Sequence, residues 1–101
     1  MPHPTSAGLW YIGNMVAERQ VERIQTGVRM EKRLYRVLKA LAGTFDISLG
    51  DLLEGIVLHA LEGKAPFQRS SLRKIEALRR VYGLDLTAED SHRLVEEEPD
   101  L

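Results

Sequence analysis

The chain has 101 residues, of which 44% are hydrophobic and 29% are charged, and its formal net charge is −1 at pH 7. This length and balance are typical of one small globular domain with tails. The absence of cysteine excludes disulfides, cysteine nucleophiles and thiolate metal sites. We expect a cytoplasmic protein, because no apolar run approaches the roughly 20 residues that span a membrane and the N-terminus lacks a signal-peptide pattern.

The charges are distributed unevenly along the chain. Residues 1–83 contain 13 Lys/Arg against 8 Asp/Glu, a balance of +5, whereas residues 84–101 contain 1 Arg against 7 Asp/Glu, a balance of −6. A basic body favours a polyanionic partner, and the acidic tail would modulate that contact or bind a second partner. The alternative is an ordinary solvated surface.

The first elements in chain order are an N-terminal arm over residues 1–20 and a β-strand over residues 24–30. The arm is expected to be partly flexible, and its Trp10-Tyr11 pair would dock on the body or order on a partner. In the strand, a period of two separates an apolar face from an outward face. The apolar face consists of Ile24, Thr26, Val28 and Met30, and the outward face of Gln25, Gly27 and Arg29.

The chain offers no second strand, so the predicted strand would need a partner from a second copy of the chain. The alternative is one long helix over residues 15–41, since Val21, Ile24 and Val28 are also at helical spacing. Gly27 and its β-branched neighbours disfavour that helix.

Two helices are predicted next, over residues 31–42 and from Ser48 to about residue 61. The first has one apolar stripe, and Gly43 is well placed to end it in a left-handed conformation. Ser48 and Asp51 form a capping-box pattern at the start of the second helix. That helix is apolar almost all round, so it needs burial on more than one side, which also favours a dimer.

Residues 65–101 are expected to form a helical extension with an acidic tail. A helix over residues 70–82 would be capped by Ser70 or Ser71 and ended by Gly83. Thr87, three residues before Asp90, would cap a last short helix through residue 95.

A strand, a helix, a glycine-containing corner and a Ser-capped helix in a required dimer resemble the ribbon-helix-helix superfamily of bacterial DNA-binding proteins, the group of the Arc and Met repressors. The resemblance covers about residues 23–63. It implies a mainly α fold with one short strand, in which an intertwined homodimer forms an intermolecular antiparallel β-ribbon that enters the major groove. Residues 21–64 would then be the DNA-binding and dimerisation domain.

The resemblance also implies the residues of the site. Base-reading positions would be Gln25, Gly27 and Arg29, with Arg23 at the edge. Phosphate-binding positions would be Ser48, Leu49, Gly50, Lys32, Arg33 and Arg36. The dimer core would be Ile24, Val28, Met30, Leu34, Val37, Leu38, Leu41, Leu52 and Ile56. Arg pairs with guanine and Gln with adenine through two hydrogen bonds, whereas Gly27 departs from the pattern because it has no side chain to read with.

We therefore expect a sequence-specific double-stranded DNA-binding transcriptional repressor that acts as a homodimer, with no cofactor, no metal and no membrane role. The alternatives are an antitoxin whose residues 66–101 bind a toxin, and a protein-interaction module without a DNA role. An enzyme is not expected, since the three histidines are scattered and the contiguous Asp90-Ser91-His92 is not how catalytic triads are built.

Overall fold

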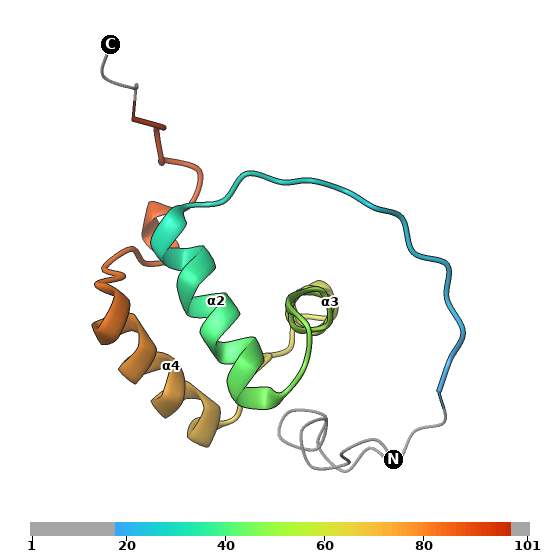
Figure 1. Cartoon of the computed structure of the whole chain (residues 1–101). Coiled ribbons are helices and arrows are strands. Elements are labelled where there is room, and N and C mark those ends of the chain that lie inside the picture. Colours follow the sequence, from blue (N-terminus) through green and yellow to red (C-terminus); the bar gives the residue numbers. More distant parts are fainter. Residues whose placement is uncertain (1–17, 98–101) are drawn as a thin grey trace.

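The protein is described by a computed structural model of a single chain, in which residues 18–97 are placed (Figure 1). The described part consists of three helices and one 3₁₀ turn, which are α2 (Lys32–Phe45), α3 (Leu49–Leu61), α4 (Arg69–Tyr82) and η1 (Ala88–Asp90). Trp10 and Tyr11 lie outside the described residues. No helix in the described part is long and apolar enough to span a membrane.

Helix α2 is the centre of the fold, because both other helices pack against it (Figure 1). The core consists of Leu41, Ala42 and Phe45 from α2 and Leu52 from α3. Phe45 and Leu52 have no exposed surface. Partly buried apolar side chains surround this core, and they are Leu38, Ile47, Ile56, Phe67, Ile75 and Leu78. The helix predicted after Pro66 is therefore part of the same core as the two helices before it.

The end of α2 differs from the prediction. The helix passes through Gly43 and ends at Phe45, and Asp46 takes the left-handed conformation with φ of 58°. The backbone N–H of Asp46 donates to the carbonyl oxygens of Ala42 and Gly43. The extra turn puts the ring of Phe45 into the core, and an Asp adopts the left-handed conformation more easily than most residues. Burial of Phe45 thus outweighs the stop signal of glycine.

The caps of the other helices are partly as predicted. Ser48 is confirmed as the N-cap of α3, since its Oγ accepts from the Asp51 N–H at 3.0 Å. Gly83, with φ of 65°, is confirmed as the residue that ends α4. The prediction of Ser70 or Ser71 as the cap of α4 is wrong, because the helix begins at Arg69 after Gln68 and Ser71 is buried inside it.

The predicted last helix through residue 95 is also wrong. Only the turn η1 forms, and the Thr87 N–H donates to the Asp90 carboxylate at 2.8 Å to hold it. The residues after Asp90 provide few apolar side chains, so a longer helix would gain little from packing.

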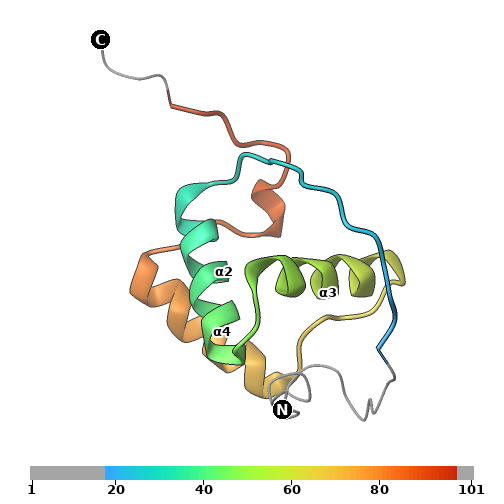
Figure 2. The ribbon, with the colours of Figure 1, turned by 45° about the vertical axis from the view of Figure 1, so that its right-hand side comes forward.

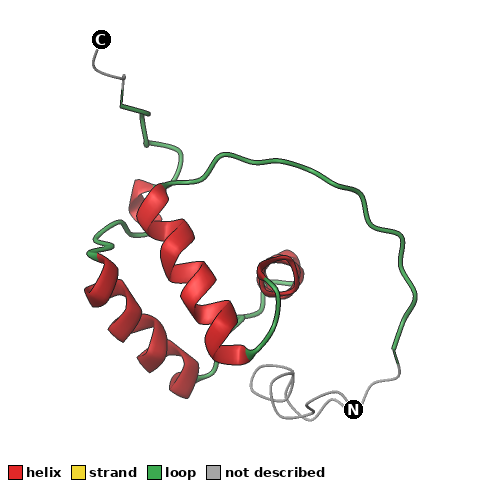
Figure 3. Ribbon diagram, viewed as in Figure 1, coloured by secondary structure: helices red, strands yellow, loops and turns green. Residues whose placement is uncertain are grey.

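The predicted strand is the main error. Residues 18–31 follow a path without strand or helix, and no strand occurs anywhere in residues 18–97 (Figure 3). The described fold is all-α, so the ribbon-helix-helix fold class, with its intermolecular ribbon and intertwined dimer, is contradicted. The alternative of one helix over residues 15–41 fails as well, since α2 begins at Lys32. Alternation of apolar and polar side chains indicates which faces a strand would have. Within residues 18–97 of one chain, however, no other backbone segment pairs with residues 24–30 through hydrogen bonds.

We predict that Leu52→Ala lowers the free energy of unfolding by about 2–5 kcal/mol, because it leaves a cavity in the centre of the core. The control Leu94→Ala removes a leucine that is 53% exposed and should cost less than about 0.5 kcal/mol. Urea unfolding followed by circular dichroism measures both. Equal losses for the two variants would contradict the observed core.

Candidate nucleic-acid interface

Helix α2 presents a stripe of unpaired positive charge to solvent. Lys32, Arg36 and Lys39 are exposed and follow one another at intervals of four and three residues, which places them on one face of the helix. Within the described residues no hydrogen bond or ion pair occupies their charged groups. The stripe lies on the outer side of α2 because the other sides face α3 and α4. We call these three residues the α2 stripe.

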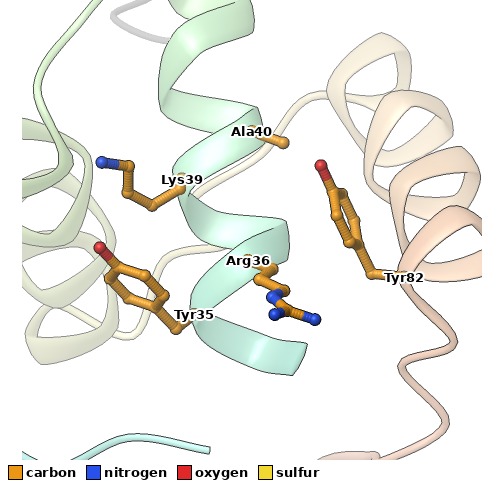
Figure 4. Close-up of a pocket in the computed structure, with 5 residues that line it drawn as sticks. All are labelled: Tyr35, Arg36, Lys39, Ala40 and Tyr82. Atoms are coloured by element: carbon orange, nitrogen blue, oxygen red, sulfur yellow. The ribbon is translucent and has the colours of Figure 1, made fainter. Parts of the chain in front are cut away.

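A shallow open groove of about 510 Å³ adjoins the α2 stripe. It is lined by Tyr35, Arg36, Lys39, Ala40 and Tyr82. In Figure 4, Tyr35 and Lys39 lie on one side of α2, and Tyr82 reaches toward the groove from α4 on the other. A phenol offers a hydroxyl that can donate to phosphate and a ring that can stack on a base or a guanidinium. The groove therefore combines two cationic side chains, Arg36 and Lys39, with two aromatic side chains, Tyr35 and Tyr82.

The sequence resemblance predicts Arg36 as a phosphate contact, and this stays a prediction, but it does not single out Tyr35 or Tyr82. Tyr35 is four residues before Lys39, so helical spacing was a signal for that pair. Tyr82 is 47 residues after Tyr35 in the sequence and joins the groove only because α4 packs on α2. No spacing rule connects residues that far apart.

Arg33 is held away from the stripe by several acceptors. Its guanidinium bonds the carbonyl oxygen of Gly83 at 2.9 Å, the Asp85 carboxylate at 3.0 Å and the Glu31 carboxylate at 3.3 Å. The hydrogen bond to Glu31 is the main reason that the pKa of Arg33 is raised above its ordinary value. This predicted phosphate contact is thus already occupied in the single chain.

Glu31 joins the segment before α2 to the helix itself. Its carboxylate accepts from the backbone N–H of Arg33 at 2.9 and 3.0 Å and from that of Leu34 at 3.1 Å, so it caps the helix. The N–H of Arg33 is the largest reason that the pKa of Glu31 is lowered. The cap fixes where α2 begins and thereby the face on which Lys32 lies.

The predicted base-reading residues all lie within residues 18–29, which are exposed. Arg23 pairs with Glu54 of α3 through two hydrogen bonds of 2.8 and 2.9 Å. This pairing raises the pKa of Arg23 and lowers that of Glu54, in each case chiefly through the side-chain hydrogen bond. Arg29 pairs with Glu96. Gln25 and Gly27 are exposed, and a Cβ on Gly27 would meet nothing within 4 Å.

The predicted phosphate-binding positions at the start of α3 lie at the N-terminus of a helix. Gly50 and Ser48 are exposed, and Leu49 is half-buried. The Ser48 hydroxyl is engaged as the cap of the Asp51 N–H. The Asp51 carboxylate lies in the same first turn, where its negative charge opposes an incoming phosphate.

The predicted dimer-core residues divide into two groups. The first group is buried or half-buried within one chain and consists of Met30, Val37, Leu38, Leu41, Leu52 and Ile56. The second group is exposed and consists of Ile24, Val28 and Leu34. Exposed fractions of 85% for Ile24 and 74% for Val28 show that the fold of one chain gives these side chains no packing partner.

Residues 18–97 contain no cluster of three or more His, Cys, Asp or Glu side chains that would hold a metal ion. Comparisons of the chain with protein-family models, with curated proteins and with solved structures gave no match.

We predict that Glu31→Ala destabilises the protein by about 1 kcal/mol at pH 7, as the loss of an N-cap usually does. Because folding lowers the pKa of Glu31 from its ordinary 4.5, the cap stabilises above that pH and is lost as the pH falls through the folded pKa. The difference from the wild type, measured by urea unfolding across pH, should therefore shrink below about pH 4. Glu22→Ala, at an exposed position without an observed partner, is the control. A difference that stays constant with pH would refute the role of the carboxylate.

Proposed function

We propose that this protein is a cytoplasmic, homodimeric, double-stranded DNA-binding transcriptional repressor. The observation that carries the proposal is the α2 stripe, whose three cations are exposed and unpaired beside a groove with two tyrosines. Clustering of Lys and Arg on one helix face is the electrostatic pattern of a nucleic-acid surface. The balance of +5 over residues 1–83 supports the same class of partner.

The α2 stripe and the segment before it have different tasks in this proposal. Lys32, Arg36 and Lys39 contact phosphates, which positions the protein without reading sequence. Gln25 and Arg29 contact base edges, since their side chains suit adenine and guanine. Residues 18–29 are exposed, and the chain runs from them through Met30 and Glu31 into α2, so a peptide arm that enters a groove of the duplex is continuous with the phosphate contacts.

The proposed homodimer rests on apolar surface that one chain leaves exposed. Val57, Leu58 and Leu61 of α3 are 50%, 63% and 78% exposed. They lie within five residues of one helix and so form one apolar patch. Ile24 and Val28, in the segment before α2, are further exposed apolar side chains. A second copy of the chain that covers α3 would bury these side chains, and each would contribute about 1.5–3 kcal/mol on full burial.

We predict that Arg36→Ala weakens binding to all duplexes alike, whereas Arg29→Ala changes the preference among sequences. Loss of one phosphate contact should reduce the slope of log K against log salt concentration by about 1. Loss of a base contact should cost about 1–3 kcal/mol of discrimination. Fluorescence anisotropy with labelled duplexes at several salt concentrations measures both effects.

Arg73→Ala is the control for these variants, because it removes one exposed arginine of α4 outside the proposed surface. If Arg73→Ala weakens binding as much as Arg36→Ala does, the α2 stripe has no special role. If Arg29→Ala leaves both affinity and preference unchanged, its assignment as a base-reading residue is wrong.

We predict that Leu58→Glu converts the dimer into monomers, because it places a charge in the proposed apolar contact of α3. Sedimentation equilibrium measures the mass of the assembly. The control Val81→Glu introduces the same charge at a 73% exposed position of α4 and should leave the dimer intact. A wild-type protein that sediments as a monomer, or a dimer that survives Leu58→Glu, would contradict this interface.

A protein-interaction module is the second candidate, and the exposed apolar face of α3 is the observation that favours it. In that case a different protein, and not a second copy, covers the face. The antitoxin alternative has less support, because α4 contributes Ile75 and Leu78 around the core of this chain. A folded protein that shows no salt-dependent binding to DNA would favour the interaction module.

A further inference from the structure

The C-terminal segment lies against Arg29, which belongs to the proposed DNA surface, and against Arg33, which the resemblance predicted to bind phosphate. It leaves α4 at Gly83 and passes beside the start of α2, as two views of the chain show (Figures 1 and 2). Asp85 bonds the guanidinium of Arg33 at 3.0 Å, and Glu96 bonds that of Arg29. Both carboxylates thus take the place that a phosphate or a base edge would take.

Two further features of residues 84–97 favour a competing role: the fixed position at which the segment begins and its acidic composition. The side chain of Leu84 is 6% exposed, so the segment begins at a fixed point next to Arg33. Residues 84–97 contain 5 Asp/Glu against 1 Arg. Tethering such a segment beside a basic surface gives its carboxylates a high effective concentration there.

We propose that residues 84–97 compete with DNA for Arg29 and Arg33 and so attenuate binding by the same chain. This inference rests on the proposed function, because it concerns the regulation of that site. Binding of a duplex requires that Glu96 releases Arg29 and that Asp85 releases Arg33. In the free chain the α2 stripe has no partner within the described residues. It can therefore contact phosphates before Glu96 and Asp85 release the two arginines.

The two contacts are weak enough to lower the affinity for DNA without preventing binding. The side chains of Arg29 and Glu96 are 85% and 70% exposed, and ion pairs so open to water are weak and screened by salt. In the second contact Asp85 is 82% exposed, although Arg33 is only 37% exposed. A polyanion that offers several phosphates will displace them. The effect on affinity should therefore be modest at each contact.

The test compares two double variants that change the net charge equally. Asp85→Asn with Glu96→Gln removes the two competing carboxylates, whereas Glu89→Gln with Glu97→Gln removes two carboxylates of the same segment that make no ion pair in the described structure. Anisotropy at about 50 mM monovalent salt, with one labelled random-sequence duplex, should show the first variant to bind about three- to tenfold more tightly than the second.

A second comparison separates competition from general repulsion. The gain from Glu96→Gln should disappear when Arg29 is already alanine, because no guanidinium is left to release. A gain that persists in Arg29→Ala, or equal affinities of the two double variants, would overturn the inference while leaving the proposed function in place. Absence of binding by the wild type and by every variant would overturn the proposed function, and the inference with it.

Discussion

The packing of α2 between α3 and α4 is the constraint on which the rest of the structure depends. Leu41, Ala42 and Phe45 are buried in this contact, and Leu52 completes it from α3. A helix with a neighbour on two sides has one side left for solvent, and in α2 that side carries Lys32, Arg36 and Lys39. The same packing brings Tyr82 to the groove beside Tyr35. Removal of core volume would thus disturb the basic surface as well as the stability.

Two sets of positive charges, one in and before the first turn of α2 and one along its exposed face, differ in their partners within residues 18–97. Arg23, Arg29 and Arg33 are bonded to acidic side chains, whereas the α2 stripe has no partner in residues 18–97. Exposed ion pairs contribute little to stability, so the first set remains available to a stronger polyanion. The division explains how a chain with a net charge of −1 can still present a basic surface.

How much could be predicted from the sequence depended on whether the deciding interaction was local. Ser48 and Gly83 were found because a cap involves residues within one turn. The end of α2 was missed, since burial of Phe45 is a tertiary effect that outweighs Gly43. The strand was predicted from alternation alone, and alternation cannot show whether a backbone partner exists. Of the candidate site, Arg36 was predicted through the resemblance, whereas Tyr82 joins the groove only through packing of α4.

The most direct test of the account is to select bound duplexes from a random pool of double-stranded DNA with the purified full-length protein, at one stated salt concentration near the physiological value. If the protein is a sequence-specific homodimer, we expect enrichment of a motif that is two-fold symmetric or repeated. We also expect the affinity for DNA to fall steeply as the salt concentration rises. A folded protein that retains no duplex, or retains all sequences equally, would contradict sequence-specific DNA recognition.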